Sequence, residues 1–180
     1  MRITINNALL LIIDVQEKLT PHIKDHALVV SRIARVTSGA AALAVPVMVN
    51  EQYKKGLGNT VAELKPLIRD YPHFEKITFS SADDEATMNA IHQQNKKYVI
   101  ICGIETHVCI MQTALDLLAC GYSPVIVCDA VGSRFADDHH IALKRLSQAG
   151  AILTTSESML FELCRNAKSP VFKTISSLVK

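Results

Sequence analysis

The sequence predicts a single α/β domain in which a mostly parallel, Rossmann-like sheet of six strands lies between two layers of helices. Three observations lead to this prediction: short apolar runs, amphipathic stretches between them, and no linker rich in Pro, Gly or Ser. Uninterrupted apolar runs are typical of strands that are buried on both faces, and alternating strands and helices indicate an α/β fold. The 180 residues fit one domain, residues 1–180, with room for a substantial core.

Four strands are predicted from strong apolar runs and two from weaker ones. The strong runs occupy residues 8–13, 45–49, 98–102 and 124–128, and the weaker ones occupy residues 73–77 and 151–154. Helices are expected where apolar residues recur at helical spacing, at residues 25–43, 83–94, 106–120 and 137–149. The connection at residues 50–71 is long and carries one short predicted helix near residues 61–67. Long connections in compact domains are often functional.

Local signals mark the ends of several helices. Ser81 with Asp84, and Thr154 with Glu157, have the spacing of capping boxes. Gly150 follows a predicted helix at a position where a left-handed residue is favoured. These signals predict where the helices begin and end. The sequence shows no sign of a second domain or an internal repeat.

Composition excludes several classes of function. Charged residues make up 20% of the chain, and the net charge of +2 is spread without a long basic block, so no nucleic-acid partner is expected. The longest apolar stretch, residues 40–49, is too short to span a bilayer, and no signal peptide is expected. The five cysteines include no pair at two-residue separation, which favours reduced thiols in a cytoplasmic protein.

Ligands of an open parallel sheet bind beyond the carboxyl ends of its strands, and three reactive side chains occupy such positions. Asp14 directly follows the first apolar run, where partial burial would raise its pKa and suit it to carry protons. Its alternative role is that of a turn or capping aspartate. Lys76 lies at the end of the third predicted strand, where a solvated surface lysine would be equally ordinary.

Cys109 is predicted to lie in or near the first turn of the helix that follows the 98–102 strand. Free backbone N–H groups and the helix dipole favour a thiolate there, and the same N–H groups could bind an oxyanion. The alternative is a core thiol like Cys102. A carboxylate, an amine and a thiol would converge on one crevice if their three strands are neighbours.

Several segments, taken in order, resemble the isochorismatase-like cysteine hydrolase family. They are Leu10-Leu11-Ile12-Ile13-Asp14-Val15-Gln16, Phe74-Glu75-Lys76, Cys102-Gly103-Ile104-Glu105-Thr106-His107-Val108-Cys109-Ile110, Thr113-Ala114 and Cys128-Asp129-Ala130. The resemblance extends over nearly the whole chain and implies that Asp14, Lys76 and Cys109 form a catalytic triad. It also implies a cis peptide bond between Ile104 and Glu105, which would aim the N–H groups of Glu105 and Cys109 at an oxyanion.

The resemblance also bears on metals and on the substrate. Nicotinamidases of this family carry an Asp-x-His metal pair after the second strand, where this chain has Asn50-Glu51-Gln52, so neither a metal nor another cofactor is expected. Cys109 favours the amidase-like branch, because isochorismatases proper tend to lack the nucleophilic cysteine. The residues expected to form the substrate pocket are Gln16, Asn50, Tyr53, Phe79 and Thr106.

The leading hypothesis is a metal-independent cysteine hydrolase that acts on a small amide or related C–N substrate through a cysteinyl acyl-enzyme. The expected partners are the small-molecule substrate and further copies of the chain in a homo-oligomer. One alternative is a non-catalytic binding or interaction protein that keeps the hydrolase fold. A redox sensor that uses Cys109 is disfavoured, because no resolving cysteine lies nearby in the sequence.

Overall fold

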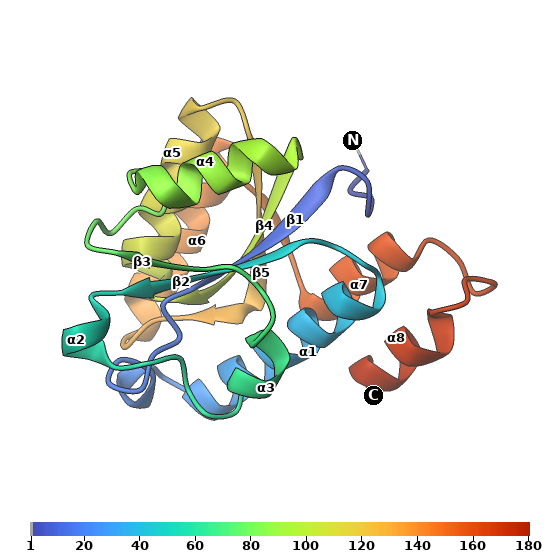
Figure 1. Ribbon diagram of the computed structural model, residues 1–180, viewed down its shortest axis with the longest axis horizontal. Helices are drawn as coiled ribbons and strands as arrows, with labels where there is room; N and C mark the ends of the chain where they lie inside the picture. Colours follow the sequence, from blue (N-terminus) through green and yellow to red (C-terminus); the bar gives the residue numbers. More distant parts are fainter. Residues whose placement is uncertain (1) are drawn as a thin grey trace.

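In the computed structural model, which describes residues 2–180, six parallel strands form one sheet in the order β3-β2-β1-β4-β5-β6 (Figure 1). The strands are β1 (Ala8–Ile13), β2 (Val47–Gln52), β3 (His73–Lys76), β4 (Tyr98–Ile104), β5 (Ser123–Gly132) and β6 (Ile152–Thr154). The helices are α1 (His26–Ala42), α2 (Lys54–Leu57), α3 (Lys65–Ile68), α4 (Glu85–Gln94), α5 (Met111–Ala119), α6 (Ala136–Ala149), α7 (Ser156–Cys164) and α8 (Phe172–Val179). Short turns η1 (Thr20–His22) and η2 (Thr106–Ile110) precede α1 and α5.

Helices cover both faces of the sheet, which confirms the predicted three-layer α/β/α architecture (Figure 1). The strand β1 is buried throughout, and its alternate residues point to opposite layers. Leu10 and Ile12 contact the layer of α1, α7 and α8, whereas Leu9, Leu11 and Ile13 contact the layer of α4, α5 and α6. The uninterrupted apolar runs therefore arise because each strand has no solvent-facing side.

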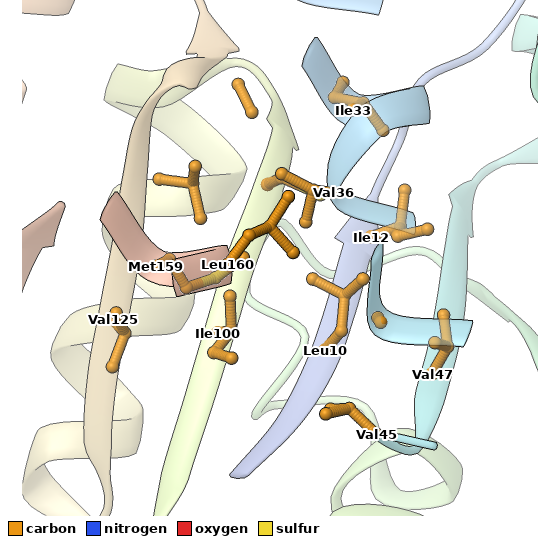
Figure 2. Close-up of a cluster of buried hydrophobic side chains, with 14 of the residues drawn as sticks. Leu10, Ile12, Ile33, Val36, Val45, Val47, Ile100, Val125, Met159 and Leu160 are labelled. Atoms are coloured by element: carbon orange, nitrogen blue, oxygen red, sulfur yellow. The ribbon is translucent and has the colours of Figure 1, made fainter. Parts of the chain in front are cut away.

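Figure 2 shows the core between the sheet and α1 with α7. Branched side chains from four neighbouring strands interlock with side chains from the two helices, and burial of each contributes about 1.5–3 kcal/mol. The labelled residues of this cluster are Leu10, Ile12, Ile33, Val36, Val45, Val47, Ile100, Val125, Met159 and Leu160. No helix within residues 2–180 combines the length and apolarity that crossing a membrane requires.

Three strands continue further than their apolar runs predict. The strand β2 ends at Gln52, β4 at Ile104 and β5 at Gly132, whereas the predicted ends were residues 49, 102 and 128. Polar residues such as Asn50 still pair in the sheet, in register with Ile13. The change to polar residues after residue 49 therefore does not mark the end of β2.

The predicted helices at residues 25–43, 83–94 and 137–149 are confirmed to within two residues at each end. The predicted 106–120 helix begins with a π-helical turn before α5. The short helix α3 lies a few residues later than expected, and the sequence analysis did not predict α2 or α8.

Both capping boxes were placed wrongly. Asp84 is itself the N-cap of α4 and accepts a hydrogen bond from the Thr87 N–H at 2.8 Å. Thr155, not Thr154, caps α7 through the Ser158 N–H. Gly150 ends α6 with φ +104°, as predicted.

Gly103 allows β4 to approach β1 closely at the functional edge. Its φ is +126°, and a Cβ at this position would overlap the carbonyl oxygen of Ile13. We therefore expect Gly103→Ala to lower the free energy of unfolding by about 2–4 kcal/mol, measured by urea denaturation. Gly121→Ala is the matched control, because Gly121 has φ +84° but no atom within 4 Å of its Cβ position. Equal losses in the two variants would contradict the close-approach argument.

Candidate active site

The structure brings Asp14, Lys76 and Cys109 together at the carboxyl edge of the sheet. Asp14 follows β1, Lys76 ends β3, and Cys109 lies in the η2 turn that follows β4. Their exposed fractions are 0%, 1% and 6%. The strands β1 and β4 are neighbours at the point where the strand order reverses, which is the usual ligand-binding crevice of a doubly wound sheet.

A left-handed turn directs Asp14 into this crevice. Its φ is +57°, a conformation that aspartate tolerates better than most residues. The Asp14 N–H still donates to the Asn50 carbonyl at 3.0 Å, so the chain leaves the sheet immediately after this bond. The turn keeps the carboxylate buried at the end of β1.

Lys76 places a fully buried ammonium group beside this carboxylate. Its Nζ donates to Asp14 Oδ2 at 2.7 Å and to Gln52 Oε1 at 2.7 Å. Two backbone carbonyls complete the environment, those of Phe79 at 3.1 Å and Thr78 at 3.2 Å. Every partner is an acceptor, so the positive charge is hydrogen-bonded on all sides, as a buried charge requires.

Burial raises the pKa of Asp14 above its ordinary value, and this effect exceeds the lowering by Lys76 and Cys109. The charge of Glu51 adds a smaller upward contribution. While Oδ2 binds Lys76, Oδ1 is buried without a hydrogen-bond partner among residues 2–180. The Cys109 thiol is close enough for the two groups to shift each other's pKa, although it does not form a well-aligned hydrogen bond with Oδ1.

Burial favours the neutral thiol form of Cys109 over the thiolate. Burial raises the pKa of its Sγ, the charge of Asp14 raises it further, and Lys76 lowers it only in part. The sequence argument that the helix terminus favours a thiolate did not include this burial, which acts in the opposite direction. Asp14 is the carboxylate next to this thiol.

The backbone between β4 and Cys109 has an unusual shape. The peptide bond between Ile104 and Glu105 is cis. The Glu105 carboxylate accepts from the backbone N–H of Arg134 at 3.2 Å and from its guanidinium Nε at 3.1 Å. The Arg134 side chain is thus paired within the protein.

The residues expected to form the substrate pocket have different environments. Gln16 is buried and bonded to the backbone of Gln52 and Gly58, so its side chain holds the connection in place. Thr106 is buried and shares a hydrogen bond of 3.0 Å with His139 Nδ1. The sequence analysis treated both as pocket residues, but their polar groups are bonded inside the protein.

The other three expected pocket residues keep atoms available. Asn50 donates to Thr87 Oγ1 at 2.8 Å, and its Oδ1 is buried without a partner in the described part of the chain. Tyr53 and Phe79 are 48% and 56% exposed, and each follows a strand at the same edge as Asp14. They are the residues of the expected set that can meet a ligand from solvent.

The sequence analysis did not name Gln52 among the expected site residues. Its amide links Lys76 Nζ to the carbonyl of Ile77. Gln52 pairs with Lys76 across β2 and β3, a signal that was missed because β2 was predicted to end at residue 49. Among residues 2–180, no three His, Cys, Asp or Glu side chains are grouped as metal ligands.

Comparison with known proteins places this geometry in a family. The family model of the isochorismatase domain matches residues 8–158. Isochorismatase domain-containing protein 1 of Salmo salar is 42% identical over 167 residues, which cover 93% of this chain but only 59% of that relative. The secreted isochorismatase effector Isc1 of Phytophthora sojae is 38% identical over 183 residues, covering 99% of this chain and 87% of the relative.

Solved structures share the whole fold. The MAR1 ribonuclease of Caenorhabditis elegans superposes with a TM-score of 0.94 at 39% identity, covering 99% of this chain and 92% of that one. YcaC of Escherichia coli, described as an octameric hydrolase of unknown specificity, has a TM-score of 0.93 at 27% identity, covering 99% and 90%. YcaC of Pseudomonas aeruginosa, solved with hexane-2,5-diol and covalent acrylamide, has a TM-score of 0.93 at 25% identity, covering 99% and 90%. Sequence and fold agree, and the chain belongs to the isochorismatase family.

Proposed function

We propose that the protein is a metal-independent cysteine hydrolase that cleaves a small amide or related C–N substrate through a cysteinyl acyl-enzyme. The observation that carries the proposal is the buried association of Asp14, Lys76 and Cys109. A buried ion pair costs several kcal/mol of desolvation and often stabilises a fold less than apolar packing would, so its presence beside a thiol favours a chemical role. The hydrolase description of E. coli YcaC supports the same class of reaction.

In the first half of the proposed reaction, Cys109 Sγ attacks the carbonyl carbon of the substrate. Its proton passes to Asp14 Oδ1, the oxygen that has no hydrogen-bond partner in the described chain. Backbone N–H groups of Glu105 and Cys109 bind the oxyanion that forms. Asp14 then gives the proton to the departing nitrogen, the C–N bond breaks, and an amine and a thioester remain.

In the second half, water attacks the thioester carbon while Asp14 takes a proton from it. The C–S bond breaks, Asp14 returns the proton to sulfur, and the carboxylic acid product leaves with Cys109 restored as a thiol. Lys76 fixes the Asp14 carboxylate through Oδ2. The raised pKa of Asp14 suits both of its duties, because a base that must also act as an acid works best when its pKa lies near the working pH.

The proposal is tested with purified protein and a panel of small amides, ureas and esters, scored for amine or ammonia release and for acid product. Cys109→Ala is assayed in parallel. A short RNA belongs in the panel, because the C. elegans neighbour is described as a ribonuclease. Hydrolysis of an amide that is lost in the variant supports the proposal. A ligand that binds at the site without turnover would favour the non-catalytic alternative. RNA cleavage that depends on Cys109 would show that the substrate is RNA and not a small amide.

Acrylamide is an informative member of the panel, because the P. aeruginosa YcaC structure contains it in covalent form. A small unsaturated amide that reaches Cys109 would form a stable adduct by addition of the sulfur to its double bond. Such an adduct on Cys109 would support access of small amides to the site.

Activity is expected to survive exhaustive chelation. Gln52 uses its amide on Lys76 and Ile77, and amide oxygens are weaker transition-metal ligands than carboxylate or imidazole. The measurement is the hydrolysis rate before and after chelation, together with metal analysis of the purified protein. Activity that is lost on chelation and restored by zinc or iron would contradict the metal-independent mechanism.

We also propose that the chain assembles as a homo-oligomer. Large apolar side chains are strongly exposed, among them Ile77 at 71%, Phe135 at 66% and Ile141 at 67%. Contact with a partner surface would remove such side chains from water. The octameric state described for E. coli YcaC supports the same conclusion. Light scattering of the purified protein tests it, and a monomeric mass at micromolar concentration would refute it.

A further inference from the structure

We infer that Gln52 is a positioning residue that holds the Lys76 ammonium against Asp14 through a neutral, doubly anchored amide. The inference rests on the proposed function and extends it to a residue that does not touch the reacting atoms. Gln52 acts through Lys76, whose Nζ contacts both Gln52 Oε1 and Asp14 Oδ2 at 2.7 Å.

The Gln52 side chain is fixed at both ends. Its Oε1 accepts from Lys76, and its Nε2 donates to the Ile77 carbonyl at 2.7 Å. A flipped amide would place N–H groups against the ammonium and an oxygen against a carbonyl, so only one orientation is favourable. The oxygen therefore faces Lys76 permanently.

The Gln52 backbone is anchored as well. Its N–H donates to Gln16 Oε1 at 2.7 Å, and its carbonyl accepts from Gln16 Nε2 at 2.9 Å. Gln52 is also paired with Lys76 across β2 and β3. The Gln16 side chain and the pairing with β3 hold the Gln52 backbone, and the Ile77 carbonyl holds its side-chain amide. Together these contacts restrict the position of Gln52 Oε1 beside the ammonium.

The neutrality of the amide is essential to this role. A glutamate at this position would place a second negative charge on the ammonium, in competition with Asp14, and could not donate to Ile77 while ionised. An apolar side chain of equal length would offer no acceptor. The Gln52 amide accepts a hydrogen bond from the ammonium without adding a charge. Asp14 is then the only carboxylate that Lys76 Nζ contacts among residues 2–180.

The expected consequence is a change in the protonation of Asp14. Burial raises the pKa of this carboxyl, and Lys76 opposes the rise. The other groups that act on it are Cys109 and Glu51. Gln52 does not titrate, so any effect of its replacement on Asp14 must pass through the position of Lys76 or through a charge that the replacement introduces.

The test uses alkylation of Cys109 by acrylamide and needs no knowledge of the substrate. The rate is followed by mass spectrometry of the Cys109 peptide across about pH 4 to pH 9, in the unaltered protein and in Gln52→Met and Gln52→Glu. The exposed Cys120 is an internal reference in each sample. Thr37→Val is the matched control, because it removes a buried hydrogen bond of 2.8 Å within α1, away from the site.

We expect the acidic limb of the Cys109 profile to move up by about one pH unit in Gln52→Met, a tenfold change in the protonation equilibrium of Asp14. Gln52→Glu should move it in the same direction, because the new carboxylate competes for the same ammonium. Thr37→Val should keep the original profile. Because Gln52→Glu also introduces a charge, the second neutral variant Gln52→Leu decides the question if circular dichroism shows that Gln52→Met is unfolded.

Unchanged profiles in folded Gln52 variants would overturn the positioning role and leave the proposed hydrolase standing. An equal shift in Thr37→Val would also overturn it, since the effect would then reflect general loosening. Failure of acrylamide to label Cys109 in the unaltered protein would contradict the nucleophile itself, and the inference would fall with the proposed function.

Discussion

Replacing Cys109 by alanine is expected to lower turnover of any identified substrate by about 10⁶-fold, to the background rate. The variant keeps the buried Asp14–Lys76 pair but lacks the sulfur that forms the acyl-enzyme. The measurement is kcat/KM, together with intact-protein mass spectrometry for the thioester.

Cys102→Ala is the matched control for this variant. Cys102 is also a buried thiol, with an exposed fraction of 0%, but it lies inside β4. Its replacement should cost some stability and leave kcat/KM near that of the unaltered protein. A Cys109→Ala enzyme that retains substantial turnover would remove covalent catalysis from the mechanism.

Replacing Lys76 by methionine is expected to lower kcat/KM by about 10⁴-fold while the fold persists. Methionine preserves much of the length and apolar packing of the lysine stem but removes the charge that Asp14 Oδ2 contacts at 2.7 Å. Without this charge, nothing from Lys76 opposes the effect of burial on the pKa of Asp14, so a smaller fraction of the carboxyl is ionised and able to accept the thiol proton. Circular dichroism measures whether the variant folds, and the pH dependence of kcat/KM reports the changed protonation of Asp14.

Lys65→Met is the control for Lys76→Met. Lys65 forms an ion pair of 2.9 Å with Glu17, but both side chains are nearly half exposed. A surface pair of this kind contributes little, so stability and turnover should remain close to those of the unaltered protein. Near-normal turnover in a folded Lys76→Met protein would exclude Lys76 from the site.

The order of strands and helices was predictable because burial on both faces leaves an unmistakable apolar run in each central strand. The run at β1 matches its structural bounds, Ala8–Ile13, and the Asp14 that follows it lies where the strand-end rule places ligand-binding residues. The rule needs no knowledge of packing, only of where each strand stops.

The ends of the longer strands and the state of Cys109 could not be predicted in the same way. Asn50 and Gln52 are polar residues that continue β2, and only the pairing of neighbouring strands reveals this. The helix dipole could be inferred from the sequence around Cys109, but the burial that raises the pKa of its thiol could not. This burial depends on residues that are distant in the sequence. Cellular location stays a prediction, and the name of one relative describes a secreted effector.

The hydrogen bonds of the Lys76 ammonium limit which residues around this site can change during evolution. Two of its four partners are carbonyls of the loop after β3, those of Thr78 and Phe79, so the loop with the exposed Phe79 ring is fastened to the charge beneath it. An insertion or deletion in residues 77–79 would alter substrate contacts and disturb the ammonium at the same time. Replacing the exposed ring of Tyr53, which follows β2, removes no partner of the ammonium. New substrate ranges should therefore evolve first through the β2 side of the entrance, while the length of the loop after β3 stays constant.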